Sequence, residues 1–259
     1  MTRQPTEGRR NSLAALQVTE IVRRLDQGMT GPYLVRAEDG ELYVAKGKGA
    51  TKRGLMVEWI CAHLARRIGL SIPDFTFLEV PQELLDALAT GATSLGAGIA
   101  FGSRQEVSVQ EFAITQLERV PSDQRRLLLT FDWWIENGDR SLSPHGGNPN
   151  LLWRASDRRL LVIDHNLAFN AGADFDKGKF FSTHVFRADA DAAFYDLVNR
   201  IELSTRLHSA SACFDTALAA IPEPWKWVDA ECTIPVQVDW SAVRNRLVQR
   251  AELTRGCPV

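Results

Sequence analysis

The chain has 259 residues, of which 45% are apolar, and a formal net charge of −2 at neutral pH. This length allows one large domain with an ample core, and the composition shows no bias toward disorder. The near-neutral charge gives no general attraction to nucleic acid or to a membrane surface, and no run of about 18 apolar residues could span a bilayer. The four cysteines form no Cys-x-x-Cys pair, so no zinc site is expected. The polar N-terminus lacks an apolar signal sequence, and we expect a cytoplasmic chain with reduced thiols.

Three short strands are predicted near the N-terminus. They lie within residues 19–25, 33–36 and 41–46, with a turn at 27–32 and a hairpin signal at Glu38-Asp-Gly40. Such β-branched and aromatic runs separated by glycine-containing turns are typical of an antiparallel meander. Gly28 and Gly31 occupy the first turn, where backbone N–H groups could cover phosphates; a plain hairpin turn remains the alternative.

A helix is predicted over residues 55–68, because its apolar residues recur at helical spacing and Gly69 follows as a stop. Glu58 lies off the main apolar stripe, among small apolar neighbours, where a half-buried carboxylate needs a cation. Lys46, at the end of the third strand, is the favoured partner. Lys48 and Lys52 compete, but they belong to a glycine-rich stretch, residues 47–54, that we expect to be a flexible, solvated loop. His63 is expected to pack within the helix.

The middle of the chain is less informative. Residues 72–80 read as a further strand, and residues 81–97 as a loop and helix of unclear role. Two apolar pieces follow, at 99–103 and 107–113. One of them should supply the backbone that bonds a nucleotide base, and the sequence does not choose between them.

Three polar residues, Asp139, Asn150 and Asp164, each lie next to an apolar segment of the chain. A capped helix begins at Ser122 and ends at Asn137-Gly138, directly before Asp139. A hairpin follows, in which Asn150 precedes the first strand and Asp164 follows the second, so hairpin closure brings these two residues together. Phosphoryl transfer needs a carboxylate that orients the attacking hydroxyl, and an amide oxygen and a second carboxylate that hold Mg²⁺ against ATP. We therefore interpret Asp139 as the catalytic base, and Asn150 and Asp164 as metal ligands.

The remaining candidates have structural interpretations. Trp133 and Trp134 are expected to be core anchors, and Arg140 is expected to form a structural ion pair. His165 is expected to have a local structural role. Helices are predicted over residues 188–207 and 209–220 and from Asp239 to about residue 254. This helix-rich tail, with its tryptophans, is interpreted as core.

These motifs resemble those of the HipA-like kinases, a branch of the protein-kinase-like superfamily. The resemblance rests on Asn137-Gly-Asp-Arg140, Asn148-Pro-Asn-Leu-Leu152 and Ile163-Asp-His165, with Tyr43-Val-Ala-Lys46 and Glu58 upstream, and covers roughly residues 17–170. The Gly-Asp-Arg sequence is also similar to the catalytic loop of phosphatidylinositol kinases. By this resemblance, Lys46 would bind nucleotide phosphates while Glu58 holds it in place.

Two features depart from the protein-kinase pattern. There the asparagine follows the aspartate by about five positions, whereas here Asn148 is nine (148 − 139) and Asn150 eleven (150 − 139) after Asp139, so residues 141–147 form an insertion. We favour Asn150 over Asn148 because it directly precedes the apolar residues 151–153. The metal loop reads Asp164-His165-Asn166 instead of Asp-Phe-Gly.

The resemblance implies an α+β, two-lobed protein-kinase-like fold. Residues 12–105 would form a small N-terminal β-sheet lobe with one helix, and residues 106–259 a larger, helical C-terminal lobe. The implied function is an ATP- and Mg²⁺-dependent phosphotransferase acting on a protein serine or threonine, with an antitoxin-like partner. A small-molecule kinase and a catalytically silent binding module with the same fold remain the alternatives.

Overall fold

The computed structural model of the chain describes residues 14–26, 30–88, 94–143, 146–170 and 177–252. Five strands at the N-terminal end form a closed barrel in the order β1-β2-β3-β5-β4. Their bounds are β1 Leu16–Arg24, β2 Tyr33–Ala37, β3 Leu42–Lys46, β4 Phe75–Val80 and β5 Gly98–Arg104. The pairings are antiparallel, except that β1 runs parallel to β4 where Leu16 lies opposite Leu78. The three expected strands are present, and β4 and β5 complete the barrel.

The strand that carries Lys46 has two distinct faces. Tyr43 and Ala45 of β3 are buried in a small apolar core inside the barrel. Because successive side chains of a strand point to opposite faces, Lys46 points to the other side of β3. There its Nζ atom donates a hydrogen bond to Glu58, which belongs to the long helix α1.

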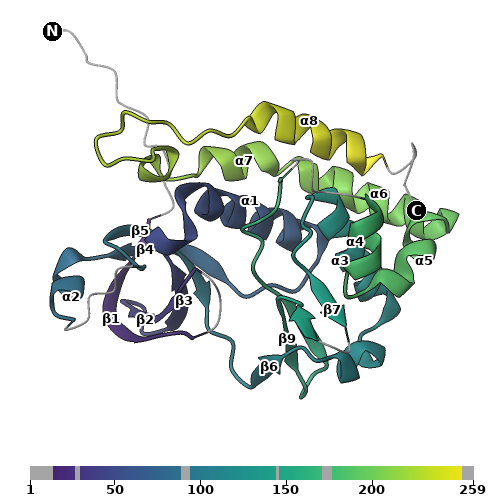
Figure 1. The fold of residues 1–259 in the computed structure, drawn as a ribbon, viewed down its shortest axis with the longest axis horizontal. Coiled ribbons are helices and arrows are strands. Elements are labelled where there is room, and N and C mark those ends of the chain that lie inside the picture. The colour runs from purple at the N-terminus through teal and green to yellow at the C-terminus, as the bar shows by residue number, and fades with distance from the viewer. Residues whose placement is uncertain (1–13, 27–29, 89–93, 144–145, 171–176, 253–259) are drawn as a thin grey trace, which may run out of the picture.

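The helix α1, Lys52–Ile68, lies between the barrel and the C-terminal helices (Figure 1). Most of its residues are buried in the larger apolar core of the protein. It begins at Lys52, earlier than predicted, because the Thr51 hydroxyl caps the helix by accepting a hydrogen bond from Gly54 N at 3.1 Å. The expectation of a solvated loop over residues 47–54 is therefore wrong. A 3-10 helix, η1, covers Lys48–Ala50, and Lys52 is half-buried in the first turn of α1.

The C-terminal part is largely helical. Its α-helices are α3 Ser122–Trp134, α4 Lys177–Thr183, α5 Ala190–Phe194, α6 Leu197–Ser211, α7 Phe214–Ala219 and α8 Trp240–Ala251, and a short α2, Gln82–Asp86, follows β4. Three further 3-10 helices are η2 Ile114–Arg119, η3 Arg187–Asp189 and η4 Glu223–Lys226. The single helix predicted over residues 188–207 is divided, because Asp196 takes an extended conformation and caps α6 by accepting from Asn199 N.

Two small sheets lie between the barrel and these helices. One has the order β10-β9-β6 and the other pairs β7 with β8. Their bounds are β6 Val109–Glu111, β7 Ser141–Ser143, β8 Gly146–Asn148, β9 Leu151–Arg154 and β10 Arg159–Val162. The expected hairpin is thus β9–β10. The insertion forms a second hairpin, β7–β8. Of the two apolar pieces, the first is β5 of the barrel and the second contains β6, and their part in base binding stays a prediction.

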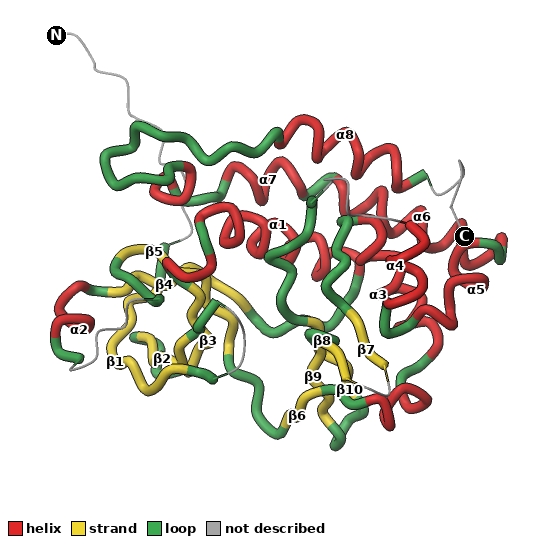
Figure 2. The backbone as a smooth tube through the Cα atoms, viewed as in Figure 1, coloured by secondary structure: helices red, strands yellow, loops and turns green. Residues whose placement is uncertain are grey.

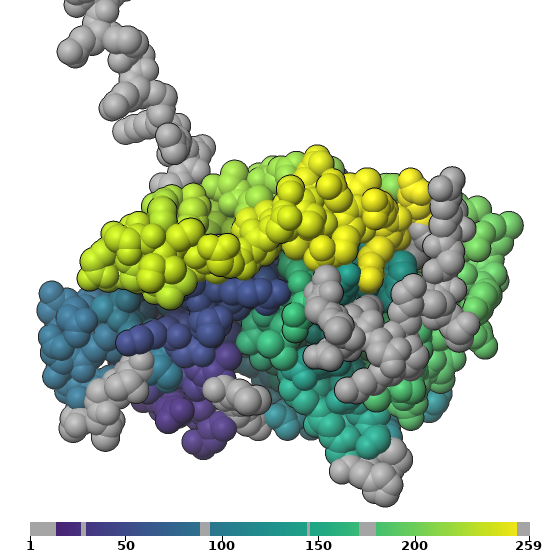
Figure 3. All heavy atoms as spheres, turned by 45° about the horizontal axis from the view of Figure 1, so that its top comes forward, coloured from purple at the N-terminus to yellow at the C-terminus, as the bar shows by residue number. Residues whose placement is uncertain are grey.

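The barrel strands β1–β5 gather at one end of the molecule, whereas the small sheets lie in the same half as α3, α4 and α5 (Figure 2). The C-terminal residues form a continuous ridge that runs from the barrel end to the helical end (Figure 3). None of the helices within the described ranges is long and apolar enough to cross a membrane.

Candidate active site

Lys46 lies at the centre of the candidate site. Its Nζ atom is 3.1 Å from Oε2 of Glu58 and 2.7 Å from Oδ1 of Asp164. The side chains are little exposed, at 11% for Lys46, 6% for Glu58 and 25% for Asp164. The expected pairing of Lys46 with Glu58 is confirmed, and neither Lys48 nor Lys52 takes the inner position. One ammonium group therefore links β3, α1 and the segment that follows β10.

The charges of this cluster stabilise one another. Burial would lower the pKa of Lys46, but Glu58 and Asp164 outweigh it and raise the pKa. Burial would likewise raise the pKa of Glu58, but Lys46 and the contacts with His165 lower it well below its usual range. Glu58 also accepts a hydrogen bond from His165 N at 3.0 Å, which binds the chain just after Asp164 to α1. The pKa shifts of Lys46 and Glu58 thus keep both of these groups charged at neutral pH.

Asp139 forms a second cluster with both candidate asparagines. The Asn150 Nδ2 atom donates to the Asp139 backbone oxygen at 2.9 Å and to its Oδ2 at 3.3 Å. Asn148, in the exposed β8, donates to the same Oδ2 at 3.5 Å. Asn150 is therefore the more closely held of the two.

The charge of Asp164 acts on Asp139 across these clusters. Burial raises the pKa of Asp139, the hydrogen bond from Asn150 lowers it, and the charge of Asp164 raises it further, with a net increase. A net rise is what a half-buried carboxylate beside another carboxylate should show, and a cation between them would relieve the repulsion. The structure thus brings the clusters of Lys46 and Asp139 within electrostatic range of each other.

The donor set fits a hard divalent cation. Asn150 donates through its amide nitrogen, and no hydrogen bond from the described part of the chain reaches its Oδ1. A free amide oxygen and carboxylate oxygens are the ligand types that Mg²⁺ prefers. Asn150 and Asp164 also have left-handed backbone conformations, with φ of 49° and 58°. Asparagine and aspartate tolerate this conformation better than other residues that carry a side chain.

Two buried residues near the site escaped the sequence analysis. Asp132 of α3 forms a 2.5 Å ion pair with Arg140, and His184 lies 3.1 Å from the same carboxylate. The structural ion pair expected for Arg140 is confirmed. The signal that could have revealed Asp132 is a carboxylate within the apolar run of residues 127–135, which needs a nearby cation.

The predicted phosphate-covering glycines are only partly described. Gly28 lies outside the described residues. Gly31 has a φ of 57°, and its carbonyl oxygen accepts from Ser94 Oγ at 2.9 Å. The neighbouring Thr30 carbonyl lies against Gly49, where an added Cβ would come within 2.4 Å. Thr30 therefore lies against the 3-10 helix η1, which follows Lys46, and the contact of this turn with a nucleotide stays a prediction.

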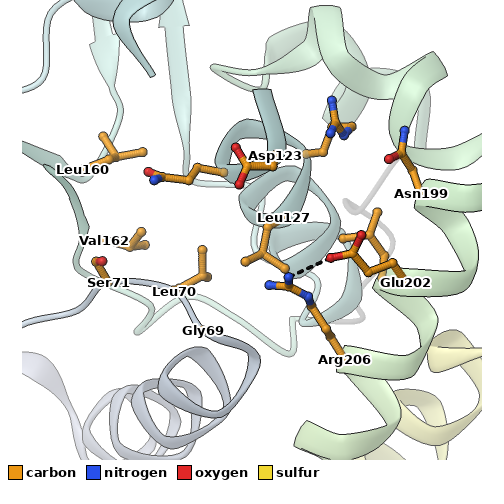
Figure 4. Close-up of a pocket in the computed structure, with 13 residues that line it drawn as sticks. Gly69, Leu70, Ser71, Asp123, Leu127, Leu160, Val162, Asn199, Glu202 and Arg206 are labelled. Carbon is orange, nitrogen blue, oxygen red and sulfur yellow. Dashed lines mark hydrogen bonds and ion pairs between the residues drawn. The ribbon is translucent and has the colours of Figure 1, made fainter. Parts of the chain in front are cut away.

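A pocket of about 190 Å³ lies elsewhere, at the C-terminal end of α1. Its lining includes Leu70, Leu127 and Val162, and the Glu202–Arg206 ion pair of α6 closes one side (Figure 4). None of the candidate site residues lines this pocket, so we do not assign the phosphoryl-transfer chemistry to it.

Comparisons with known proteins place these features in context. A family model described as HipA-like kinase matches residues 18–254. The structure is similar to that of the Golgi casein kinase, with a TM-score of 0.50 and 13% identity over 93% of this chain and 73% of that chain. It is also similar to the proinflammatory kinase CtkA of Helicobacter pylori, with a TM-score of 0.49 and 10% identity over 92% of this chain and 94% of that chain. The comparison with curated proteins gives no match. The similarity to the Golgi casein kinase indicates a kinase fold.

Proposed function

Because the chain belongs to the HipA-like kinase family, we propose that it transfers the γ-phosphoryl group of ATP to a serine or threonine hydroxyl of a protein, with Mg²⁺ as the metal. The main support for the proposal is the pair of ion pairs that the Lys46 Nζ atom forms, with Glu58 at 3.1 Å and with Asp164 at 2.7 Å. In protein kinases, phosphoryl transfer requires a lysine–glutamate ion pair together with an aspartate that holds Mg²⁺, and Lys46 contacts a candidate for each of these carboxylates.

Each residue has a proposed role. Lys46, positioned by Glu58, binds the nucleotide phosphates. Asp139 accepts the proton of the attacking hydroxyl, and its raised pKa supports a role as base. Asn150 and Asp164 hold Mg²⁺, which when bound neutralises charge on the phosphates. Gly28 and Gly31 cover the phosphates through their backbone N–H groups.

The proposal includes the layout of the molecule. The barrel and α1 support a small lobe of residues 12–105, and the helical part supports a larger lobe of residues 106–259. The nucleotide would lie between them, where Lys46 meets Asp164. Family membership also suggests a regulatory partner protein of the antitoxin type.

Two substitutions test the assignment of roles. Asp164→Ala is expected to abolish Mg²⁺-dependent ATP binding, whereas Asp139→Ala is expected to keep binding and to lose transfer. Calorimetry with ATP, with and without Mg²⁺, measures binding, and transfer of radiolabel from ATP to proteins of a cell extract measures activity. Asp157→Ala is the matched control, since Asp157 is an exposed carboxylate at the opposite end of the β9–β10 hairpin.

The same assays separate the competing functions. Full transfer by Asp139→Ala would show that the mechanism is wrong. Label found only in small molecules would indicate a small-molecule kinase. Mg²⁺-dependent binding without any transfer would indicate a silent binding module.

A further inference from the structure

Arg140 is fully buried beside the candidate site. Its side chain and that of Asp132 are both 0% exposed, and Nε of Arg140 donates to Oδ2 of Asp132 at 2.5 Å. A buried guanidinium is costly unless a carboxylate and hydrogen-bond acceptors compensate for its lost hydration. The location of those acceptors indicates what Arg140 does.

The remaining contacts of Arg140 go to the two segments that carry the proposed metal ligands. Its Nη1 atom donates to the backbone oxygens of Pro149 at 3.0 Å, Asn150 at 2.7 Å and Ile163 at 3.4 Å. Ile163 directly precedes Asp164. The Asn150 oxygen also accepts from Ile163 N at 3.1 Å, so the start of β9 and the end of β10 meet at this guanidinium.

Asp132 holds Arg140 in place with the help of two further donors. Asn137 Nδ2 donates to Asp132 Oδ1 at 2.8 Å, and His184 Nε2 lies 3.1 Å from Oδ2. Because Phe186 N donates to His184 Nδ1 at 3.0 Å, the His184 proton is on Nε2 and points to Asp132. The carboxylate is therefore fixed from three sides, and Arg140 has little freedom to shift.

We propose that Arg140 is a positioning residue that sets the separation of Asn150 and Asp164, and thereby the affinity for the metal–nucleotide complex, with Asp132 as its anchor. The proposal rests on the proposed function, since it takes those two residues as the metal ligands. Arg140 itself touches neither metal nor nucleotide. Arginine suits this role because its planar fork can pair with a carboxylate and reach several carbonyl oxygens at once, which a lysine cannot do.

The test is Arg140→Lys, read through the Mg²⁺ concentration that gives half-maximal ATP binding. Lysine can still pair with Asp132 but cannot hold the carbonyls of Asn150 and Ile163 in the same way. We expect the required Mg²⁺ concentration to rise about 10- to 100-fold, as for other groups that orient metal ligands, while binding of ATP without Mg²⁺ is unchanged. Calorimetry at a series of Mg²⁺ concentrations measures both.

Arg125→Lys is the matched control. Arg125 also pairs with a buried carboxylate, that of Asp189, at 2.9 Å, and donates to the Val120 oxygen at 3.2 Å, but it contacts neither metal-ligand segment. This variant is expected to lower the melting temperature and to keep the wild-type Mg²⁺ requirement. If Arg140 were only structural, both variants would lose stability and both would keep that requirement.

A second variant covers the case in which Arg140→Lys does not fold. Asp132→Asn keeps the shape and an oxygen acceptor but weakens the hold on Arg140, and it should raise the Mg²⁺ requirement less. An unchanged requirement in the folded variant overturns the proposal. If the wild type itself shows no Mg²⁺-dependent ATP binding, the proposed function fails and the positioning role falls with it.

Discussion

His63 of α1 is a titratable residue within an aromatic cluster. Its ring packs edge-on against Trp59 and Phe75, at centroid distances of 4.6 and 4.9 Å. Its Nε2 atom is buried and has no hydrogen-bond partner within the described residues. Burial, followed by the nearby charge of Arg66, lowers the pKa of His63 to about 4. The folded protein therefore favours the neutral ring.

This lowered pKa predicts a loss of stability in mild acid. The unfolded chain binds a proton near pH 6.5 and the folded chain only near pH 4, so stability is lost as the pH falls between these values. At pH 5 the loss should be about 1 kcal/mol, because the partial exposure of the ring to solvent reduces the full effect of the shift. His63→Phe keeps the ring packing without the titration, and should lose less stability between pH 7.5 and 5.0 in urea denaturation.

The exposed His208 of α6 provides the control for this experiment. His208→Gln should retain the wild-type pH dependence. Equal losses in the wild type and in His63→Phe would show that His63 does not cause the effect.

At the site, single residues were predictable where a polar side chain adjoined an apolar run. Asp139, Asn150 and Asp164 stand out in this way, and Lys46 and Glu58 follow from charge compensation. Asp132 was missed because the apolar run around it, residues 127–135, was interpreted as the core face of a helix and its single carboxylate was given no partner. Periodicity cannot show that its partner, Arg140, lies beyond the helix end and is itself buried.

On the scale of elements, α1 shows how a helix end is fixed. Gly69 caps the helix with a φ of 94°, and its N–H bonds to the Arg66 oxygen at 3.2 Å. The chain then turns toward β4, so the cap sets the direction in which the chain leaves α1. The sequence predicted this end correctly, since glycine is the preferred residue in the left-handed conformation.

Replacing this glycine should cost conformational energy alone. A Cβ at Gly69 would meet only Nη1 of Arg206, at an ordinary 3.7 Å. Gly69→Ala should therefore lower the free energy of unfolding by about 1 kcal/mol, because alanine disfavours a positive φ. Gly69→Asn should cost less, since asparagine tolerates this conformation. Urea denaturation measures the free energy of unfolding of both variants. Equal losses of stability in Gly69→Ala and Gly69→Asn would contradict a conformational cause.

Other elements could not be read from the sequence for identifiable reasons. Residues 47–54 look like a solvated loop by composition, but the Thr51 cap and the burial of Ala50 and Gly54 fold them onto the core. The insertion was recognised by its spacing, whereas its β7–β8 pairing was not, because strands of three residues are too short to show an alternating pattern. Strand partners such as β4 and β5 depend on contacts distant in sequence.

On the scale of the whole molecule, the C-terminal segment, residues 221–251, joins the barrel to the helical part. At one end, Trp225 Nε1 donates to the Ile99 oxygen of β5 at 2.8 Å, and its ring packs edge-on against Phe77 of β4. At the other end, Arg250 donates to the Trp133 oxygen at 2.6 Å and pairs with Glu136 at 2.8 Å. Figure 3 shows this segment as the ridge between the two ends. The sequence predicted tryptophans in a core, but not which parts of the chain they connect.

Trp225 should therefore couple the unfolding of the barrel to that of the helices. Its side chain is fully buried, so Trp225→Ala is expected to lower stability by about 3–5 kcal/mol. Loss of the contact should also allow the barrel to unfold first. Trp59 of α1 stacks on Phe77 of β4 at 3.9 Å, so tryptophan fluorescence follows this contact with the barrel, while circular dichroism follows the helices. In denaturation of the variant, the two transitions should no longer coincide.

Two further variants make this prediction specific. Trp225→Phe keeps most of the packing and loses the hydrogen bond to Ile99, which should cost about 1 kcal/mol and preserve a single transition. Trp227→Ala removes a partly exposed ring whose Nε1 bonds only to Glu223 within the described residues, at 3.0 Å, and should change little. The prediction is wrong if Trp225→Ala shows one coincident transition and loses no more stability than Trp227→Ala. The C-terminal segment would then cover the barrel without coupling it to the helices.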